Sequence, residues 1–137
     1  MTALSSSPGK EEEAKRLGAD HFVVASEAKA GAYDLLLFTA SVGVDFDHYL
    51  SLLKPKGKFC VLGVPDQITI RPISLISGAK QMFGSPIGGT LAIEEMLAFA
   101  TRHQILPQIE KFPMSRINEA IGRLRQNKVR YRAVLEV

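Results

Sequence analysis

YDLLLF, residues 33–38, and KFCVL, residues 58–62, are two short apolar runs whose hydrophobic residues do not alternate with polar ones. Continuous apolar strands are typical of a sheet that is covered on both faces, and such a sheet is parallel, with helices in its crossover connections. Between the two runs, residues 45–53 (DFDHYLSLL) carry apolar side chains at the spacing of one helix face. This stretch therefore predicts a strand, a crossover helix and a second, parallel strand.

The same pattern extends toward both ends of the chain. Ser7 and Pro8 favour a helix start and Gly18 favours its end, so a helix is predicted over residues 8–17. Pro55-Lys56-Gly57 predicts a turn. Further strands are predicted at 2–4, 21–25, 81–85, 108–112 and 131–137, and further helices at 72–78, 91–103 and 116–126. The predicted fold class is α/β, a doubly wound parallel sheet with a C-terminal strand-helix-strand extension.

Composition narrows the class of protein. The chain has 137 residues, enough for one core, and a net charge of +3 without a cluster of Lys and Arg, so no nucleic-acid partner is expected. No apolar stretch approaches the roughly 20 residues of a membrane helix, so no membrane partner is expected. The single cysteine, Cys60, cannot form an internal disulfide, which fits a reducing compartment. We therefore expect a cytoplasmic protein.

LSSSPGK, residues 4–10, lies where the first predicted strand ends and the first helix begins. In a dinucleotide-binding sheet this turn meets the adenosine ribose, where a carboxylate selects NAD and a cation with small donors accommodates the 2′-phosphate of NADP. Ser5, Ser6, Ser7 and Lys10 supply hydroxyls and a cation, with no carboxylate before Glu11. The stretch therefore favours a 2′-phosphate site. The alternative is a serine-rich helix cap with a solvated lysine.

Five stretches carry a resemblance to a known family: SSSPGKEEEAKRLGAD, YDLLLFTAS, YLSLLKPKGKFCVLGVP, GSPIGGTLAIEEMLAFATRHQILPQIE and INEAIGRLRQNKVRYRAVLEV. In their order and spacing they resemble the C-terminal part of zinc-dependent medium-chain alcohol dehydrogenases, in particular the cinnamyl alcohol dehydrogenase branch. The resemblance implies a partial, Rossmann-like NADP-binding domain over residues 1–104. It also implies that residues 105–137 are an extension that belongs to the catalytic domain of longer members. The implied reaction is hydride transfer between NADP(H) and a primary alcohol or aldehyde.

The resemblance also implies which residues contact the cofactor. Ser5, Ser6, Ser7 and Lys10 match positions that hold the 2′-phosphate, and Thr39 matches a position beside the adenosine. The positions that match the nicotinamide half are Leu62, Gly63, Val64, Ser85 and Ile87, and the position that matches the pyrophosphate is Arg130.

The sequence contains no motif for pyrophosphate binding and none for a zinc site. None of the eleven glycines forms a G-x-G pair, so the glycine-rich pyrophosphate loop is not among these residues. The candidate zinc ligands Cys60, His21, His48 and His103 are too widely separated to predict a metal site. The resemblance implies that the glycine loop and the zinc ligands of longer members belong to a region ahead of residue 1. We therefore expect no catalytic residue and no metal ligand in this chain, and little activity from it alone.

A missing first strand has a consequence for the sheet. In the strand order 3-2-1-4-5-6 it is the central one. Either strands 2–4 and 33–38 pair directly, or a gap leaves two unpaired edges that another chain can pair with. The family forms dimers through the strand matched by Gln81–Ser85, so a homodimer is expected. Two alternatives stay open: a non-enzymatic dinucleotide-sensing or interaction module, and part of a zinc-free enzyme of the quinone reductase type.

Overall fold

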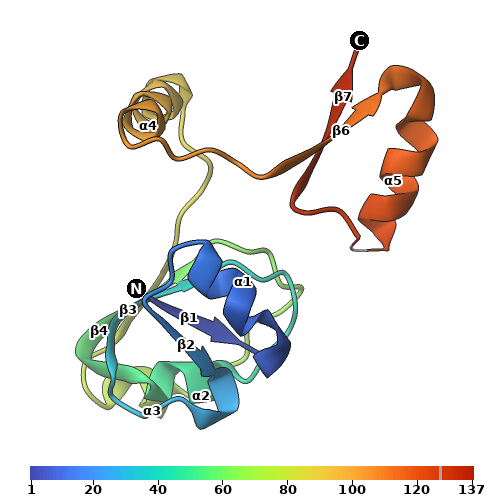
Figure 1. The fold of residues 1–137 in the computed structure, drawn as a ribbon. Coiled ribbons are helices and arrows are strands. Elements are labelled where there is room, and N and C mark those ends of the chain that lie inside the picture. The colour runs from blue at the N-terminus through green and yellow to red at the C-terminus, as the bar shows by residue number, and fades with distance from the viewer. Residues whose placement is uncertain (127) are drawn as a thin grey trace. The chain divides into compact units, whose positions relative to one another are not determined.

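The structure, a computed structural model, describes residues 1–126 and 128–137. It divides into two compact units, unit 1 (Met1–Pro86) and unit 2 (Ile87–Val137), whose elements are traced in Figure 1. All paired strands are parallel, which confirms the predicted α/β class. The division after residue 104 concerns the domains of longer family members and stays a prediction. No helix in the described part of the chain has the length and apolar character needed to cross a membrane.

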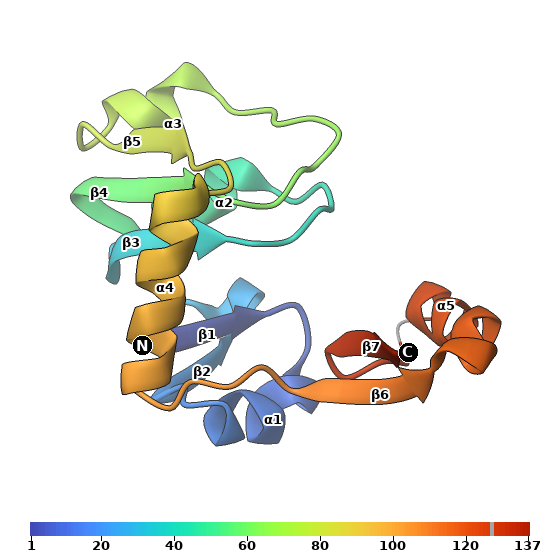
Figure 2. The same cartoon turned by 90° about the horizontal axis from the view of Figure 1, so that it is seen from above.

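The strands of unit 1 form two separate parallel sheets. β1 (Thr2–Ser5) pairs with β2 (His21–Val24), with Leu4 opposite Val23. β3 (Tyr33–Phe38), β4 (Leu53–Val61) and β5 (Gln81–Gly84) form the second sheet in that order. Figure 2 shows β1 and β3 as arrows of neighbouring sheets that point the same way. Within the described residues β1 and β3 do not pair, so the structure contains the gap rather than the direct pairing.

Helices connect these strands at the predicted places. The first predicted helix forms in two pieces, the 3₁₀ turn η1 (Pro8–Lys10) and α1 (Glu11–Arg16), and Gly18 ends it at φ +99°. The left-handed region suits glycine because it has no Cβ. The remaining helical elements of the unit are η2 (Ala25–Glu27), α2 (Phe46–Ser51) and α3 (Pro72–Ile76).

The predicted turn at Pro55-Lys56-Gly57 forms inside a strand. β4 begins at Leu53, and its register with β3 shifts where the turn residues interrupt the pairing. Lys56 adopts φ 62°, and a Cβ on Gly57 would lie 2.8 Å from the Lys54 carbonyl oxygen. The backbone is thus folded tightly enough to require glycine there. The turn is an irregularity within β4 rather than its boundary.

The core of unit 1 lies between α2 and the second sheet. Its buried side chains come from β3, from α2 and its C-terminal end, and from β4: Leu36, Phe38, Phe46, Leu50, Leu52, Leu53 and Phe59. The Phe38 and Phe46 rings meet edge to face at 5.3 Å between centroids, a favourable aromatic geometry. His48 Nε2 on α2 donates a hydrogen bond to the Ala25 carbonyl oxygen at 2.8 Å. That bond ties the end of the β1-β2 sheet to α2.

Unit 2 contains one long helix and a small strand-helix-strand element. The helix α4 (Thr90–Arg102) is followed by β6 (Ile109–Pro113), η3 (Met114–Arg116), α5 (Ile117–Arg125) and β7 (Arg132–Glu136). β6 and β7 pair in parallel, and Arg123 of α5 reaches Glu110 of β6 with 2.6 Å between Nη2 and Oε2. The predicted C-terminal strand-helix-strand extension is therefore present.

Candidate functional site

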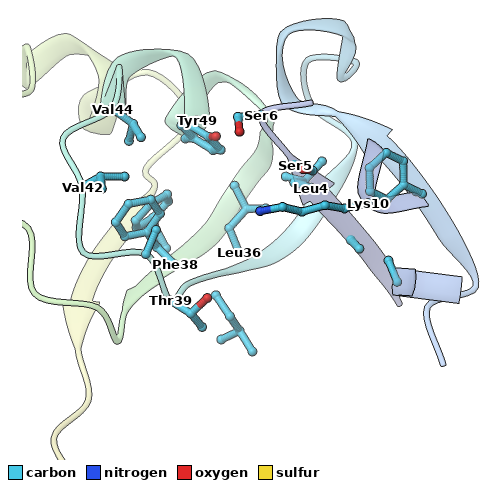
Figure 3. A pocket seen from close by; sticks show the side chains of 16 residues that line it. Leu4, Ser5, Ser6, Lys10, Leu36, Phe38, Thr39, Val42, Val44 and Tyr49 are labelled. Carbon is cyan, nitrogen blue, oxygen red and sulfur yellow. The ribbon is translucent and has the colours of Figure 1, made fainter. Parts of the chain in front are cut away.

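A cavity of about 410 Å³ opens in unit 1 beside the carboxyl ends of β1 and β3. Most of its lining comes from β1 and the turn that follows it, and from β3 and the loop that follows that strand (Figure 3). Ser5, Ser6, Lys10 and Thr39, four of the predicted cofactor residues, line it together. The carboxyl ends of parallel strands are where ligands bind in open α/β sheets. The predicted residues thus converge at the expected edge.

The turn after β1 presents hydroxyl groups and one cation. Ser7 is the residue before η1, but its side chain makes no capping hydrogen bond. Its backbone N–H instead donates to the Ser5 hydroxyl oxygen, at 3.4 Å. Helix capping therefore does not account for the Ser7 hydroxyl. Ser7 itself is not part of the cavity lining.

The charge of the cavity is positive. Lys10 is the one charged residue among the described lining residues, and no Asp or Glu lines the cavity. In Figure 3 the Lys10 side chain extends from the turn toward β3, into the space that Thr39 borders from the other side. A cation with surrounding hydroxyl groups is a donor set for a phosphate anion. The same set contains no carboxylate, the acceptor that holds the neutral 2′-hydroxyl of NAD(H) in such a sheet.

Tyr49 is a polar lining residue that the sequence did not single out. It lies on α2, and its side chain reaches the cavity from the side opposite Lys10 (Figure 3). Its ring also contacts Phe38 at 6.2 Å between centroids. The sequence places Tyr49 on the apolar face of a predicted helix, and the helix pattern alone carries no sign that its hydroxyl faces a cavity.

Leu62, Gly63 and Val64 follow β4 and lie against the end of β3. The N–H groups of Leu62 and Gly63 donate to the Phe38 carbonyl oxygen at 2.8 and 2.9 Å, and the Val64 N–H donates to the Ser41 hydroxyl at 3.2 Å. These three residues are not among those lining the cavity. A Cβ on Gly63 would lie 2.0 Å from the Ala40 carbonyl oxygen, so the two loops approach each other as closely as glycine allows.

The remaining predicted contacts lie outside the cavity. Ser85 follows β5, and its N–H donates to the Val61 carbonyl oxygen at 3.2 Å. Ile87 is 92% exposed and belongs to unit 2, as does Arg130. The Arg130 backbone N–H donates to Glu110 Oε1 at 2.7 Å. The roles of all three toward a cofactor stay predictions.

Two groups implied by the family resemblance can be tested against these residues. For a dinucleotide phosphate, the cavity provides Lys10 with hydroxyl donors at the ends of two strands, and the donor set fits. For zinc, the described residues contain no group of three or more His, Cys, Asp or Glu placed to hold a metal ion. Zinc does not fit this part of the chain, because a protein zinc site needs at least three such ligands.

Known proteins match both the sequence and the structure. "Probable cinnamyl alcohol dehydrogenase 3" of Oryza sativa subsp. japonica is 40% identical over 144 residues, covering 100% of this chain and 39% of the relative. A cinnamyl alcohol dehydrogenase structure from Sorghum bicolor superposes with a TM-score of 0.88 at 38% identity, covering 98% of this chain and 40% of that one. The structure of CAD from Helicobacter pylori complexed with NADP(H) superposes with a TM-score of 0.83 at 26% identity, with coverages of 98% and 40%.

The match is to one portion of these longer proteins. The chain spans 39% of the length of the rice relative. A sequence profile described as "Zinc-binding dehydrogenase" matches residues 1–102, which include all of unit 1. The chain therefore belongs to the zinc-binding dehydrogenase family.

Proposed function

We propose that this chain is the NADP(H)-binding part of a medium-chain alcohol dehydrogenase, and that Lys10, Ser5 and Ser6 bind the 2′-phosphate. One observation carries the proposal: these residues and Thr39, from the ends of two parallel strands, line one cavity, and among its described lining residues the only charge is that of Lys10. The relative from Helicobacter pylori, whose structure holds NADP(H), supports the choice of cofactor. Ser7, which does not line the cavity, stays a predicted contact of the 2′-phosphate.

The charge of the cavity favours NADP(H) over NAD(H). A phosphate monoester carries close to two negative charges at neutral pH, and an ammonium donor forms a charge-assisted hydrogen bond with it. The 2′-hydroxyl of NADH is neutral and is best held by a carboxylate acceptor. The described cavity lining contains no carboxylate. Lys10 would therefore have an anionic partner in the NADP(H) complex and only a neutral hydroxyl in the NAD(H) complex.

The assigned reaction is hydride transfer between NADP(H) and a primary alcohol or aldehyde. The names of the relatives, which are alcohol dehydrogenases, support this class over that of the quinone reductases. Bound NADP(H) carries the hydride, and the residues of this chain bind and orient it. No catalytic role is assigned to a residue of this chain.

The other half of the cofactor is assigned to the loops after β4 and β5. We propose that the Leu62–Val64 backbone lies against the nicotinamide, because Gly63 lets this loop pack closely on the end of β3. The Leu62 amide donates to Phe38 at the end of β3, and the Val64 amide donates to Ser41 in the loop that follows β3. Ser85 and Ile87 are assigned to the carboxamide end and Arg130 to the pyrophosphate.

A homodimer through β5 is the second part of the proposal. Within the described residues β5 pairs on one side only, with β4, and it therefore presents a free edge. Phe83 on this strand is 45% exposed. A free apolar edge favours pairing with the same edge of a second copy. Light scattering should give a dimer at micromolar concentration, and a stable monomer there would contradict this part of the proposal.

Two adenosine nucleotides test the 2′-phosphate site without involving the rest of the cofactor. We expect adenosine 2′,5′-bisphosphate to bind at least about tenfold more tightly than AMP in calorimetric titrations. A hydrogen bond to a charged group contributes roughly 1.5–3 kcal/mol, and about 1.4 kcal/mol corresponds to tenfold in affinity. Equal affinities, or no binding of either nucleotide, would contradict the assignment of Lys10.

A further inference from the structure

We propose that Asp47 is a positioning residue for the cofactor, because its carboxylate on α2 fixes the loop that runs from β4 to α3. This inference rests on the proposed function, in which the Leu62–Val64 part of that loop lies against the nicotinamide. The loop covers residues 62–71 and contains no helix or strand. It leaves the carboxyl end of β4, which is the edge of a parallel sheet where ligands bind.

The end of the loop nearest to β4 is held by the segment at the end of β3. Leu62 and Gly63 donate their N–H groups to the Phe38 carbonyl oxygen, and Val64 donates its N–H to the Ser41 hydroxyl. These bonds fix the first three residues of the loop. They do not reach its second half, which needs an anchor of its own to stay in place.

The far end of the loop is held by Asp47. Its Oδ1 accepts from the Arg71 backbone N–H at 3.0 Å and from the Ser74 hydroxyl, and its Oδ2 accepts from Arg71 Nε at 3.1 Å. Arg71 is the residue before α3, and its own side chain makes no capping hydrogen bond. The carboxylate therefore joins the start of α3, where the loop ends, to α2.

The surroundings of Asp47 suit it to hold a loop. Its side chain is only 21% exposed, whereas that of Arg71 is 75% exposed. Partial burial limits the screening of its hydrogen bonds by water. Asp47→Ala would leave the Arg71 N–H and the Ser74 hydroxyl without this acceptor and would free the far end of the loop. Binding to a loop fixed at both ends costs less conformational entropy than binding to a loop that must first be ordered.

The other half of the cofactor should not depend on Asp47. The residues assigned to the 2′-phosphate, Ser5, Ser6 and Lys10, belong to β1 and the turn after it. Asp47 is not among the residues that line their cavity. A positioning role therefore predicts a split: loss of Asp47 weakens a ligand that includes the nicotinamide and spares a ligand that ends at the adenosine.

Asp45 provides the matched control, because it is also a carboxylate at the start of α2. It is the residue before that helix, and its Oδ1 accepts from the His48 backbone N–H at 3.0 Å. Removing such a cap destabilises a helix. Asp45→Ala thus weakens α2 while leaving the bonds from Asp47 to Arg71 in place. An effect of general destabilisation would appear in both variants, and an effect of loop positioning only in Asp47→Ala.

Calorimetric titrations with NADPH and with adenosine 2′,5′-bisphosphate test the split. The parent protein, Asp47→Ala and Asp45→Ala are compared at a temperature well below the melting points measured for all three. We expect the parent to bind NADPH more tightly than the bisphosphate. Asp47→Ala should lose on the order of tenfold in NADPH affinity, with bisphosphate affinity unchanged within about twofold. Asp45→Ala should keep both affinities.

Hydrogen exchange without any ligand provides a second measurement of the same role. We expect the Gly63 and Val64 amides to exchange several-fold faster in Asp47→Ala than in Asp45→Ala, because the loop that contains them has lost its far anchor. Exchange of the amides that pair β1 with β2 should be the same in both variants.

The outcomes separate this inference from the proposed function. Bisphosphate and NADPH binding by the parent, with equal losses of both in Asp47→Ala or with no loss of either, would overturn the inference and leave the 2′-phosphate site in place. Equal effects of the two variants on NADPH affinity or on loop exchange would overturn it as well, and so would equal affinity of the parent for the two ligands. A parent protein that binds neither ligand would overturn the proposed function and this inference with it.

Discussion

Lys10, in the turn after β1, and Thr39, directly after β3, line the same cavity although β1 and β3 do not pair within the described chain. The two residues come from separate sheets of unit 1 and meet at the same edge because all strands of the unit are parallel. The cavity is thus bounded by two strand ends, as the switch point of a doubly wound sheet is. This arrangement underlies the proposed cofactor site.

Gly63 fixes the approach of the loops after β3 and β4. Gly63→Ala should lower the free energy of unfolding by about 1–3 kcal/mol, because the added Cβ would overlap the Ala40 carbonyl oxygen, 2.0 Å away. Gly43→Ala is the control, since nothing lies within 4 Å of a Cβ at that position. Urea unfolding measures both. Equal midpoints for the two variants would show that the loops are not closely packed.

The Asp47 carboxylate on α2 accepts hydrogen bonds from Arg71 and Ser74, in the segment that contains α3. The Ser74 hydroxyl, followed by the Arg71 backbone N–H, holds the pKa of the Asp47 carboxyl below its ordinary value. A lowered folded-state pKa stabilises the fold at every pH above the unfolded value of roughly 3.9, and that stabilisation is lost as pH falls through the folded value. Asp47→Asn should therefore lower the urea midpoint at pH 7.

The pH dependence distinguishes this account from a simple packing defect. The difference between the parent protein and Asp47→Asn should shrink as pH falls from about 4 through the lowered folded-state pKa, because the parent carboxyl is progressively protonated over that range. Asp66→Asn, at an exposed carboxylate, is the control and should change the midpoint little at any pH. A difference for Asp47→Asn that stays constant from pH 7 to about pH 3 would contradict the role of its charge.

Much of this architecture could be predicted from the sequence because the signals are local. The apolar runs at 33–38 and 58–62 became β3 and the C-terminal part of β4, and Gly18 ends the first helix in the left-handed region. Pro55-Lys56-Gly57 was predicted as a turn, and the backbone does fold tightly there, with Lys56 at a positive φ. It bends β4 instead of bounding it, because the pairing of Leu53 with Tyr33 resumes on its far side. That pairing is tertiary and has no local sequence signal.

In unit 2, Glu110 connects three segments. Its carboxylate accepts from Arg123 Nη2 of α5 at 2.6 Å and from the Arg130 backbone N–H at 2.7 Å. Glu110→Ala should destabilise unit 2 by about 1–2 kcal/mol, since bonds to charged groups are worth roughly 1.5–3 kcal/mol and exposure weakens them. Hydrogen exchange of the β6 and β7 amides measures this.

The ion pair of Glu136 provides the comparison. Its partner Lys111 lies 2.7 Å away, but both side chains are more than half exposed. Glu136→Ala should therefore cost under about 1 kcal/mol. If it speeds exchange in unit 2 as much as Glu110→Ala does, the connecting role of Glu110 is refuted.

The candidate site was predictable only in part. Ser5, Ser6 and Lys10 could be named because they stand where a strand ends, and strand ends converge in a parallel sheet. Thr39 could be named only from the family resemblance. Tyr49 could not, because its place on an apolar helix face gives no indication of where its hydroxyl points. The sequence also left open whether β1 and β3 pair, a choice that depends on the spacing of two sheets.

The measurement that tests the central claim most directly is a calorimetric titration of Lys10→Ala with NADPH and NADH, beside the parent protein and Lys29→Ala. Lys29 is an exposed lysine outside the cavity lining and serves as the matched control. We predict that the parent and Lys29→Ala bind NADPH more tightly than NADH, and that Lys10→Ala loses at least about tenfold in NADPH affinity with little change for NADH. Equal loss for both cofactors, or no loss for either, would contradict the assignment of Lys10 to the 2′-phosphate.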